Sequence, residues 1–321
     1  MNTKIKAAVT ALMAALISGC VSMSSTSSPG LTATEKMMWS TYALATPRGM
    51  ATCVIVNRRD PSAPNGIQPV LVTSAHVLMS APHGPFYVIV REQQPGSNPA
   101  IGVIEFSSDS GTGPAFFTLP GRDIAVMSLD IPPEFADQVP LRSFIDETTI
   151  GLPGNQCRVG DEMSILGFPH ILPGTEGAFP ILRSGKMASY SMRPPEEGKT
   201  FLINTTVFGG DSGAPVFATD RYQRRVRLAG MISQRIGEKE NGVPLAVAVN
   251  ASVIRETLDL QALGGRVDIG PVENVTAVKP QRSRAARMAG PPVPWPESVL
   301  ASRYPKSPET KTSSFVPSKR P

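Results

Sequence analysis

Three polar side chains of this 321-residue chain have the types and the order that nucleophilic catalysis requires: His76, Asp123 and Ser212. A serine hydroxyl becomes a good nucleophile when a neighbouring imidazole removes its proton and a carboxylate holds that imidazole in the right tautomer. Ser212 stands in the sequence GGDSGAP at 209–215. Its glycines permit a turn that aims the amides of Gly210 and Ser212 at one point, as an oxyanion hole requires.

The order of these residues excludes the α/β-hydrolase arrangement, in which the serine comes first and the histidine last. The histidines are His76, His83 and His170, so no base follows Ser212. His83 and His170 stand in glycine- and proline-containing stretches, and we interpret both as loop residues. Asp130, at the other end of the strand that follows Asp123, is the competing candidate for the orienting carboxylate.

The segments LVTSAHV at 71–77, RDIAVM at 122–127 and GGDSGAP at 209–215 resemble the histidine, aspartate and serine boxes of the chymotrypsin/trypsin-like serine peptidases, especially the bacterial members. The resemblance implies an all-β fold of two six-stranded antiparallel Greek-key β-barrels with the active site between them. It also implies a serine endopeptidase that acts on a protein or peptide through an acyl-enzyme, with no cofactor. No His-Glu-x-x-His or comparable cluster supports a metal site.

Two alternatives to the peptidase remain open. A catalytically silent trypsin-like binding or scaffold protein would keep the barrels and need no triad. An esterase would use the same three residues on a different substrate class. Neither alternative explains the intact His76, Asp123 and Ser212 better than peptide hydrolysis does.

By the same resemblance, Thr206 forms the floor of the primary specificity pocket, with Val207 beside it and Ser233 and Arg235 on the wall. The floor carries no carboxylate. A preference for Lys or Arg is therefore disfavoured, and a small or medium apolar residue is expected. Asp211 resembles the aspartate that pairs with a freed N-terminus in zymogen-activated relatives. Whether another group or a second cleavage supplies its partner here stays open.

The catalytic residues must be positioned by short strands, because apolar runs alternate with turns rich in Gly, Pro, Asn and Asp. A lead-in helix within Leu31–Ala45 and a closing helix at Ala251–Leu260 accompany the strands. Eleven strands are predicted: Ala51–Asn57, Val70–Thr73, Phe86–Arg91, Ile101–Phe106, Ile124–Leu129, Met163–Gly167, Pro180–Ser184, Phe201–Asn204, Pro215–Ala218, Arg227–Ser233 and Leu245–Val249.

Residues 1–20 have the pattern of a bacterial lipoprotein signal peptide. Two lysines precede a short apolar run that ends in ISGC, so we expect Cys20 to be lipidated and to become the first mature residue. An ordinary signal peptide is the alternative. Val21 follows the cysteine and favours the outer membrane, with the protein facing the periplasm. A tether and lead-in at 21–44 and a peptidase domain at 45–264 follow.

The net charge of +5 belongs to a disordered, Pro-rich basic tail at 265–321. Residues 266–320 hold ten basic and four acidic side chains, whereas residues 21–264 hold nineteen basic and twenty-two acidic ones. No nucleic-acid groove is therefore expected. Candidate partners of the tail are an anionic surface or a proline-binding protein, and a purely solubilising tail is the alternative.

Two cysteines remain after the signal peptide, Cys53 and Cys157. Export would place them where disulfides persist. The spacing alone does not show that their Cα atoms come within about 7 Å, the limit for a bridge. A Cys53–Cys157 disulfide and two buried free thiols both remain open.

Overall fold

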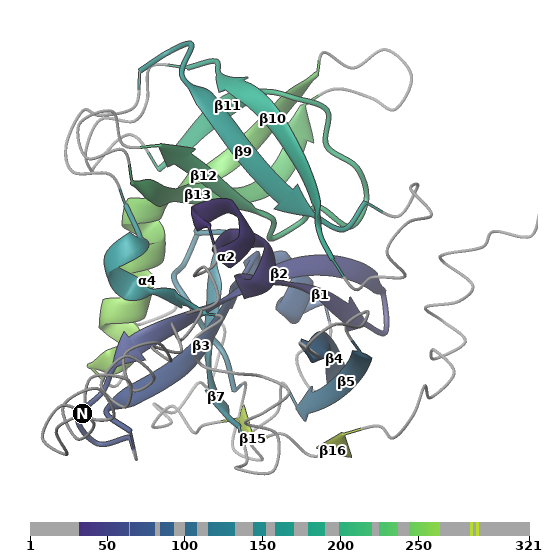
Figure 1. The fold of residues 1–321 in the computed structure, drawn as a ribbon, viewed down its shortest axis with the longest axis vertical. Helices are drawn as coiled ribbons and strands as arrows, with labels where there is room; N and C mark the ends of the chain where they lie inside the picture. The colour runs from purple at the N-terminus through teal and green to yellow at the C-terminus, as the bar shows by residue number, and fades with distance from the viewer. Residues whose placement is uncertain are drawn as a thin grey trace, which may run out of the picture. The chain divides into compact units, whose positions relative to one another are not determined.

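The computed structural model describes residues 32–63, 65–80, 84–92, 100–107, 115–131, 144–151, 158–169, 179–189, 199–219, 225–236 and 244–263, together with the backbone of 283–284 and 287–288. All helices and strands of this part belong to one compact unit, Ala33–Pro321. Two β-sheets carry the fold (Figure 1). No helix in the described part of the chain has both the length and the apolar character that a membrane-spanning segment needs.

The N-terminal sheet is a six-stranded antiparallel half-barrel in the order β7-β3-β2-β1-β4-β5. The short strands β6 (Phe117–Thr118) and β8 (Ile145–Asp146) add to β7 and β2. In the described residues β5 does not pair with β7, so this sheet stays open there. Its six main strands are β1 (Thr41–Thr46), β2 (Gly49–Arg59), β3 (Ile67–Thr73), β4 (Pro85–Glu92), β5 (Ala100–Ser107) and β7 (Ala125–Asp130).

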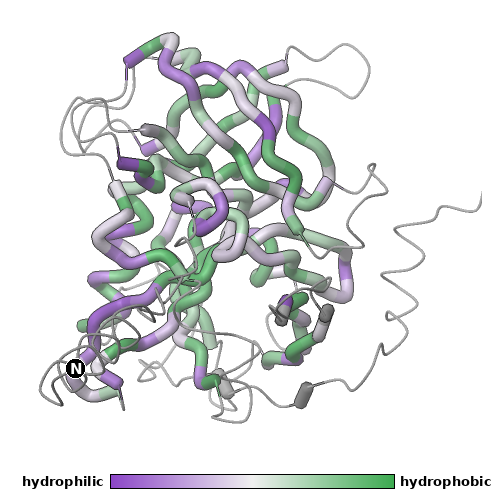
Figure 2. The backbone as a smooth tube through the Cα atoms, in the orientation of Figure 1, coloured by the Kyte–Doolittle hydropathy of each residue, from purple (hydrophilic) through white to green (hydrophobic). Residues whose placement is uncertain are grey.

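The second sheet is a closed six-stranded barrel in the order β10-β11-β14-β13-β12-β9. Its interior mixes small and larger apolar side chains, including Ala246, Ala248, Ile203 and Val216. Figure 2 shows the apolar residues gathered along the strands of both sheets. The six strands are β9 (Glu162–Gly167), β10 (Ile181–Met187), β11 (Thr200–Asn204), β12 (Pro215–Thr219), β13 (Val226–Ile236) and β14 (Leu245–Asn250).

An apolar cluster joins the two sheets. It includes Val72 of β3, Phe217 of β12 and Ile254 of the closing helix α4 (Ala251–Ala262). The helix begins directly after β14, where the Asn250 side chain accepts a hydrogen bond from the Ser252 amide at 2.9 Å. Such a cap satisfies one of the amides that the first helical turn leaves unpaired. Helix α4 therefore covers apolar surface that the two sheets share.

Arg91 of β4 fixes the junction between the lead-in helix α2 (Ala33–Ser40) and β1. Its buried guanidinium donates hydrogen bonds to the carbonyl groups of Met38, Trp39 and Thr41, at 3.0, 2.8 and 2.9 Å. Carbonyl groups at a helix C-terminus have no helical donor and need another partner. Burial lowers the pKa of Arg91 to about 10, so the side chain stays charged at neutral pH.

The predicted two-barrel fold with a short C-terminal helix is confirmed, and each of the eleven predicted strands corresponds to an observed one. A helix lies within the predicted lead-in segment, and residues 41–46 form a strand that was not predicted. The helix ends at Ser40, and the strand, β1, is buried along its whole length between β2 and β4. The tail contributes two short strands, β15 (Ser283–Arg284) and β16 (Arg287–Met288). The predicted signal peptide and tether up to residue 31 lie outside the described residues.

Candidate active site

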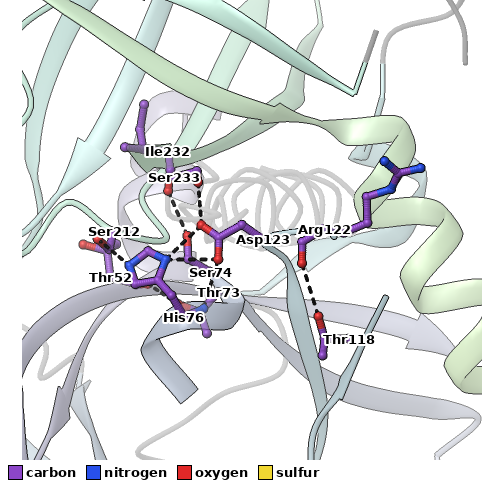
Figure 3. A network of polar contacts seen from close by, with 10 residues as sticks. All are labelled: Thr52, Thr73, Ser74, His76, Thr118, Arg122, Asp123, Ser212, Ile232 and Ser233. Atoms are coloured by element: carbon purple, nitrogen blue, oxygen red, sulfur yellow. Dashed lines mark hydrogen bonds and ion pairs between the residues drawn. The ribbon is translucent and has the colours of Figure 1, made fainter. Parts of the chain in front are cut away.

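His76 lies in the short helix α3 (Ala75–Met79), which follows β3 directly. Its backbone amide donates to Oδ1 of Asp123 at 2.9 Å. Its ring Nδ1 lies 3.0 and 2.9 Å from the two oxygens of the same carboxylate, and its Nε2 lies 3.0 Å from Oγ of Ser212 (Figure 3). A carboxylate can only accept, so Nδ1 carries the proton and Nε2 is free to accept one from the serine hydroxyl.

Asp123 precedes β7 and lies between His76 and Ser233 (Figure 3). The Ser233 hydroxyl donates to Oδ2 of Asp123 at 2.5 Å. Burial raises the pKa of the Asp123 carboxyl, but the hydrogen bonds from His76 and Ser233 outweigh it and leave the pKa below its ordinary value. The carboxylate is therefore ionised at neutral pH. Asp130 is exposed at the far end of β7, roughly 20 Å along the strand at about 3.3 Å per residue.

Ser212 sits in a turn that glycines make possible. Gly210 has φ 97° and Gly213 has φ 80°, and these are backbone conformations that are strained for any residue with a side chain. A Cβ on Gly213 would also collide with the carbonyl of Thr52 and the hydroxyl of Thr73. Thr52 holds the turn from β2, because its Oγ1 donates to the Gly210 carbonyl at 2.7 Å and its amide donates to the Ser212 carbonyl at 2.8 Å.

Strand β13 holds the same turn from the second barrel. The Gly213 amide donates to the Ile232 carbonyl at 2.9 Å, and the Ile232 amide donates to the Ala214 carbonyl at 2.8 Å. The hydroxyl of Ser74, which precedes His76 by two residues, also donates to the Ile232 carbonyl, at 3.0 Å. One residue of β13 thus joins the serine turn to the histidine helix.

Asp211, which has no exposed surface, is paired with Arg183 of β10. Arg183 Nη2 lies 2.6 Å from Oδ1 of Asp211, and the Phe208 amide donates to Oδ2 at 2.8 Å. The second terminal nitrogen of Arg183 donates to the Thr206 carbonyl at 3.0 Å. A Cβ on Gly167 would collide with the Asp211 carboxylate. An internal cation therefore supplies the partner of Asp211 that the sequence left open.

The four predicted pocket residues lie in different surroundings. Val207 is buried among the apolar side chains of the second barrel, and Thr206 beside it is exposed. Ser233 is buried with its hydroxyl on Asp123, whereas Arg235 is exposed on β13. Thr206 and Arg235 are the two of the four whose side chains are exposed.

Sequence reasoning missed Arg183 and the bond between Ser233 and Asp123. Arg183 stands in a short strand without any motif, 28 residues before Asp211. The aspartate itself was a usable signal, because a buried aspartate needs a cation or several hydrogen-bond donors. Few basic residues lie near Asp211 in sequence, so its cation had to come from a more distant segment. Ser233 was assigned to the pocket wall, and only the fold brings it to Asp123.

Of the two cysteines considered for a disulfide, the structure describes Cys53 alone. Cys53 is a free thiol with no exposed surface, packed in the core of the N-terminal sheet. Burial raises the pKa of this thiol, although nearby Arg91 lowers it in part. Cys157, Cys20, His83 and His170 lie outside the described residues.

The family model described as "Trypsin-like peptidase domain" matches residues 51–224 of the chain. No curated protein matches the chain at a significant level. The chain is similar to solved structures of the HtrA-type protease AlgW with tripeptide, at 13% and 12% identity and TM-scores of 0.44 and 0.43. These matches cover 72% and 74% of this chain but only 63% and 64% of AlgW, so the chain spans less than two thirds of AlgW's length.

Two further structures match over most of their own length. Rv3671c from M. tuberculosis, in an inactive form, is 14% identical with a TM-score of 0.41, and the match covers 74% of this chain and 92% of that one. Deg5 is 15% identical with a TM-score of 0.48, and the match covers 73% of this chain and 94% of that one.

Proposed function

Because the chain belongs to the family of trypsin-like peptidases, we propose that it is a serine endopeptidase with Ser212 as nucleophile, His76 as general base and Asp123 as the orienting carboxylate. The observation that carries the proposal is the unbroken chain of contacts from the Asp123 carboxylate through the His76 ring to Ser212 Oγ. General-base activation requires these groups to lie within hydrogen-bond reach of one another, and they do.

The reaction runs in two halves. Ser212 Oγ attacks the peptide carbonyl carbon while its proton moves to His76 Nε2, and Asp123 stabilises the resulting imidazolium. The tetrahedral intermediate then collapses, the carbon–nitrogen bond breaks, and His76 returns the proton to the leaving amine. Water, deprotonated by the same nitrogen, attacks the acyl-enzyme and releases the acid and the free serine.

The amides of Gly210 and Ser212 form the proposed oxyanion hole. Within the described residues, neither amide donates to a protein acceptor. The turn that carries them is fixed by Thr52 on one side and by the Arg183–Asp211 pair on the other. A donor that is already in position stabilises the oxyanion without reorganising, and losing one such donor costs about 10²–10³ in turnover.

The substrate is proposed to be a protein or peptide that binds in extended form along β13. Among the described strands only β14 pairs with residues 234–236, which leaves their other side available for strand addition. Thr206 offers no carboxylate to a basic side chain, so we propose a small or medium apolar residue before the scissile bond. Arg235, exposed on the same strand, would meet residues farther from that bond.

The test of this function is cleavage of an unfolded protein substrate by the purified chain, compared with the Ser212→Ala and His76→Ala variants. We expect internal cleavage by the parent and none above background by either variant, with all three proteins equally folded. A parent that binds the substrate without cleaving it would support the silent binding protein instead. Cleavage that survives Ser212→Ala would assign the activity to another group.

We further propose that Cys20 is lipidated and anchors the enzyme in the outer membrane, facing the periplasm. Support comes from the sequence alone, in the short apolar run that ends at this cysteine. Cys20→Ala should move the protein from the membrane fraction to the soluble fraction without changing the activity of its peptidase domain. An unchanged distribution would refute the lipid anchor and leave the peptidase proposal untouched.

A further inference from the structure

The end of β13 that lies beyond the serine turn has one open side. The Ile232 amide donates to the Ala214 carbonyl and the Ile232 carbonyl accepts from the Gly213 amide, so the backbone bonds of Ile232 go to the serine turn. Among the described strands, β14 alone pairs with residues 234–236 that follow. Figure 3 shows Ile232 and Ser233 beside the triad. The open side therefore begins next to the reacting groups.

The pairing of β13 with β14 turns the backbone of Arg235 toward this open side. Register pairs in an antiparallel ladder alternate between pairs that exchange both backbone hydrogen bonds and pairs that exchange neither. The pair at Ile232 is of the second kind, because its backbone bonds go to the serine turn. The next pair, at Gln234, is of the first kind, since Ser233 between them is a bulge residue. Arg235 then belongs to a pair of the second kind, so its amide and carbonyl face the open side.

The Arg235 side chain is exposed, and in the described part of the chain no carboxylate forms an ion pair or hydrogen bond with it. Its register partner Ala246 belongs to the apolar cluster inside the second barrel, as does Val207 beside Thr206. Side chains of register partners lie on the same face of a sheet. The arginine therefore extends from the sheet face that also carries the proposed pocket, and its guanidinium can bind an acid on a peptide.

A peptide that adds to β13 meets Arg235 at a defined position. Every described strand pair of the second barrel is antiparallel, and the same sense makes the peptide run from Ile236 toward Ile232. The peptide residue opposite Ser233 lies next to the triad and supplies the carbonyl that Ser212 attacks. The residue opposite Arg235 comes two positions earlier, so it is the third residue before the scissile bond. Its side chain lies on the same sheet face as the arginine.

We propose that Arg235 gives the enzyme a preference for substrates with Asp or Glu as the third residue before the scissile bond. Opposite charges at directly paired positions stabilise a sheet, and like charges there destabilise it. The proposal rests on the peptidase function proposed above, and it adds an acidic residue to the apolar one expected at the bond itself. Because the pair is exposed, the preference for Glu over Gln is about three- to fivefold in kcat/KM and falls as the salt concentration rises.

The test compares three fluorogenic substrates, acetyl-X-Ala-Val-aminomethylcoumarin with Glu, Gln or Lys as X, in which the coumarin amide fixes the scissile bond. The full-length chain should give the highest kcat/KM with Glu and the lowest with Lys. Arg235→Gln should give equal values for the three substrates, and Arg235→Glu should prefer Lys. Arg158→Glu makes the same change in net charge at an exposed position before β9, and it should keep the preference of the parent.

Equal values for the three substrates with the parent would refute the acidic preference and leave the peptidase function intact. A preference that persists in Arg235→Gln would refute the role of this residue. The Ser212→Ala variant measures the preference without cleavage, as the binding of fluorescein-labelled peptides with the same three sequences. Tighter binding of the Glu peptide, with no hydrolysis by the parent, would support Arg235 and contradict the peptidase function. Equal or absent binding, with no hydrolysis, would overturn the role of Arg235.

Discussion

Arg183 of β10 and Asp211 form an ion pair, with 2.6 Å between Arg183 Nη2 and Asp211 Oδ1 and no exposed surface on the aspartate. The aspartate is the residue immediately before Ser212, and the arginine also holds the Thr206 carbonyl. The pair therefore fixes the segment that carries both the proposed nucleophile and the proposed oxyanion amides. No freed chain terminus is needed to neutralise Asp211.

Arg183→Met should weaken both folding and catalysis, because it leaves a buried carboxylate without its cation. Removal of one partner of a buried pair costs about 3–5 kcal/mol, which urea unfolding would measure. The rate at which a fluorophosphonate forms an adduct with Ser212 should fall as the turn loosens. Arg183→Lys keeps the charge but cannot hold Asp211 and Thr206 with one rigid guanidinium. Its unfolding free energy and its rate of adduct formation should therefore lie between those of the parent and of Arg183→Met.

Arg158→Met is the matched control, since Arg158 is exposed. It should behave like the parent in both measurements. Equal unfolding free energies for the parent and Arg183→Met would contradict the role given to the ion pair. A chain that forms an adduct at Ser212 only after its N-terminus has been trimmed would also contradict this role.

Ser233→Ala should change stability in a pH-dependent way. A carboxylate whose pKa is lowered by folding contributes stability that is present above its unfolded pKa of about 3.9 and is lost as the pH falls through the folded value. Ser233 is one of the donors that lower the pKa of Asp123. The variant should therefore be less stable than the parent at pH 7, and the difference should shrink as the pH falls below about 4.

Urea unfolding from pH 3 to pH 8 measures this difference. Ser80→Ala is the matched control, because the Ser80 hydroxyl donates to the Val77 carbonyl and not to a carboxylate. Its effect on the unfolding free energy should be the same at every pH. A Ser233→Ala effect that is equally independent of pH would show that this hydroxyl does not act on the ionisation of Asp123.

Cys53 should resist alkylation while the protein is folded. The thiolate is the reactive form, and burial both raises the pKa of this thiol and blocks access. Iodoacetamide at pH 8 should modify Cys53 only after unfolding in urea, without any reductant, as mass spectrometry of the 51–59 region would show. Modification that appears only after reduction would show that the disulfide forms.

The candidate catalytic residues can be recognised from the sequence more readily than the residues that hold them in place. His76, Asp123 and Ser212 each stand in a short local pattern, so their types, order and flanking glycines are legible without the fold. Arg183 acts on Asp211 through strand pairing within the second barrel, and no local pattern marks it. The bond from Ser233 to Asp123 was not predicted, because the direction of this hydroxyl depends on how β13 meets the N-terminal sheet.

The helices and strands show the same contrast between what local sequence patterns predict and what only long-range pairing decides. The eleven predicted strands are those with apolar alternation between turn residues. Strand β1 was not predicted, because it follows the helical pattern of residues 35–39 without a turn signal, and its pairing with β2 and β4 decides its conformation. The two-residue tail strands depend wholly on the edges of β5 and β7.

If Ser212 is a nucleophile activated by His76, it should react with a fluorophosphonate, and the mass of the intact chain after exposure to this reagent measures that reaction. We expect one adduct per chain, mapped by peptide sequencing to Ser212, absent in Ser212→Ala and strongly slowed in His76→Ala. A folded parent chain that forms no adduct, or an adduct that persists in Ser212→Ala, would contradict the role of Ser212 as nucleophile.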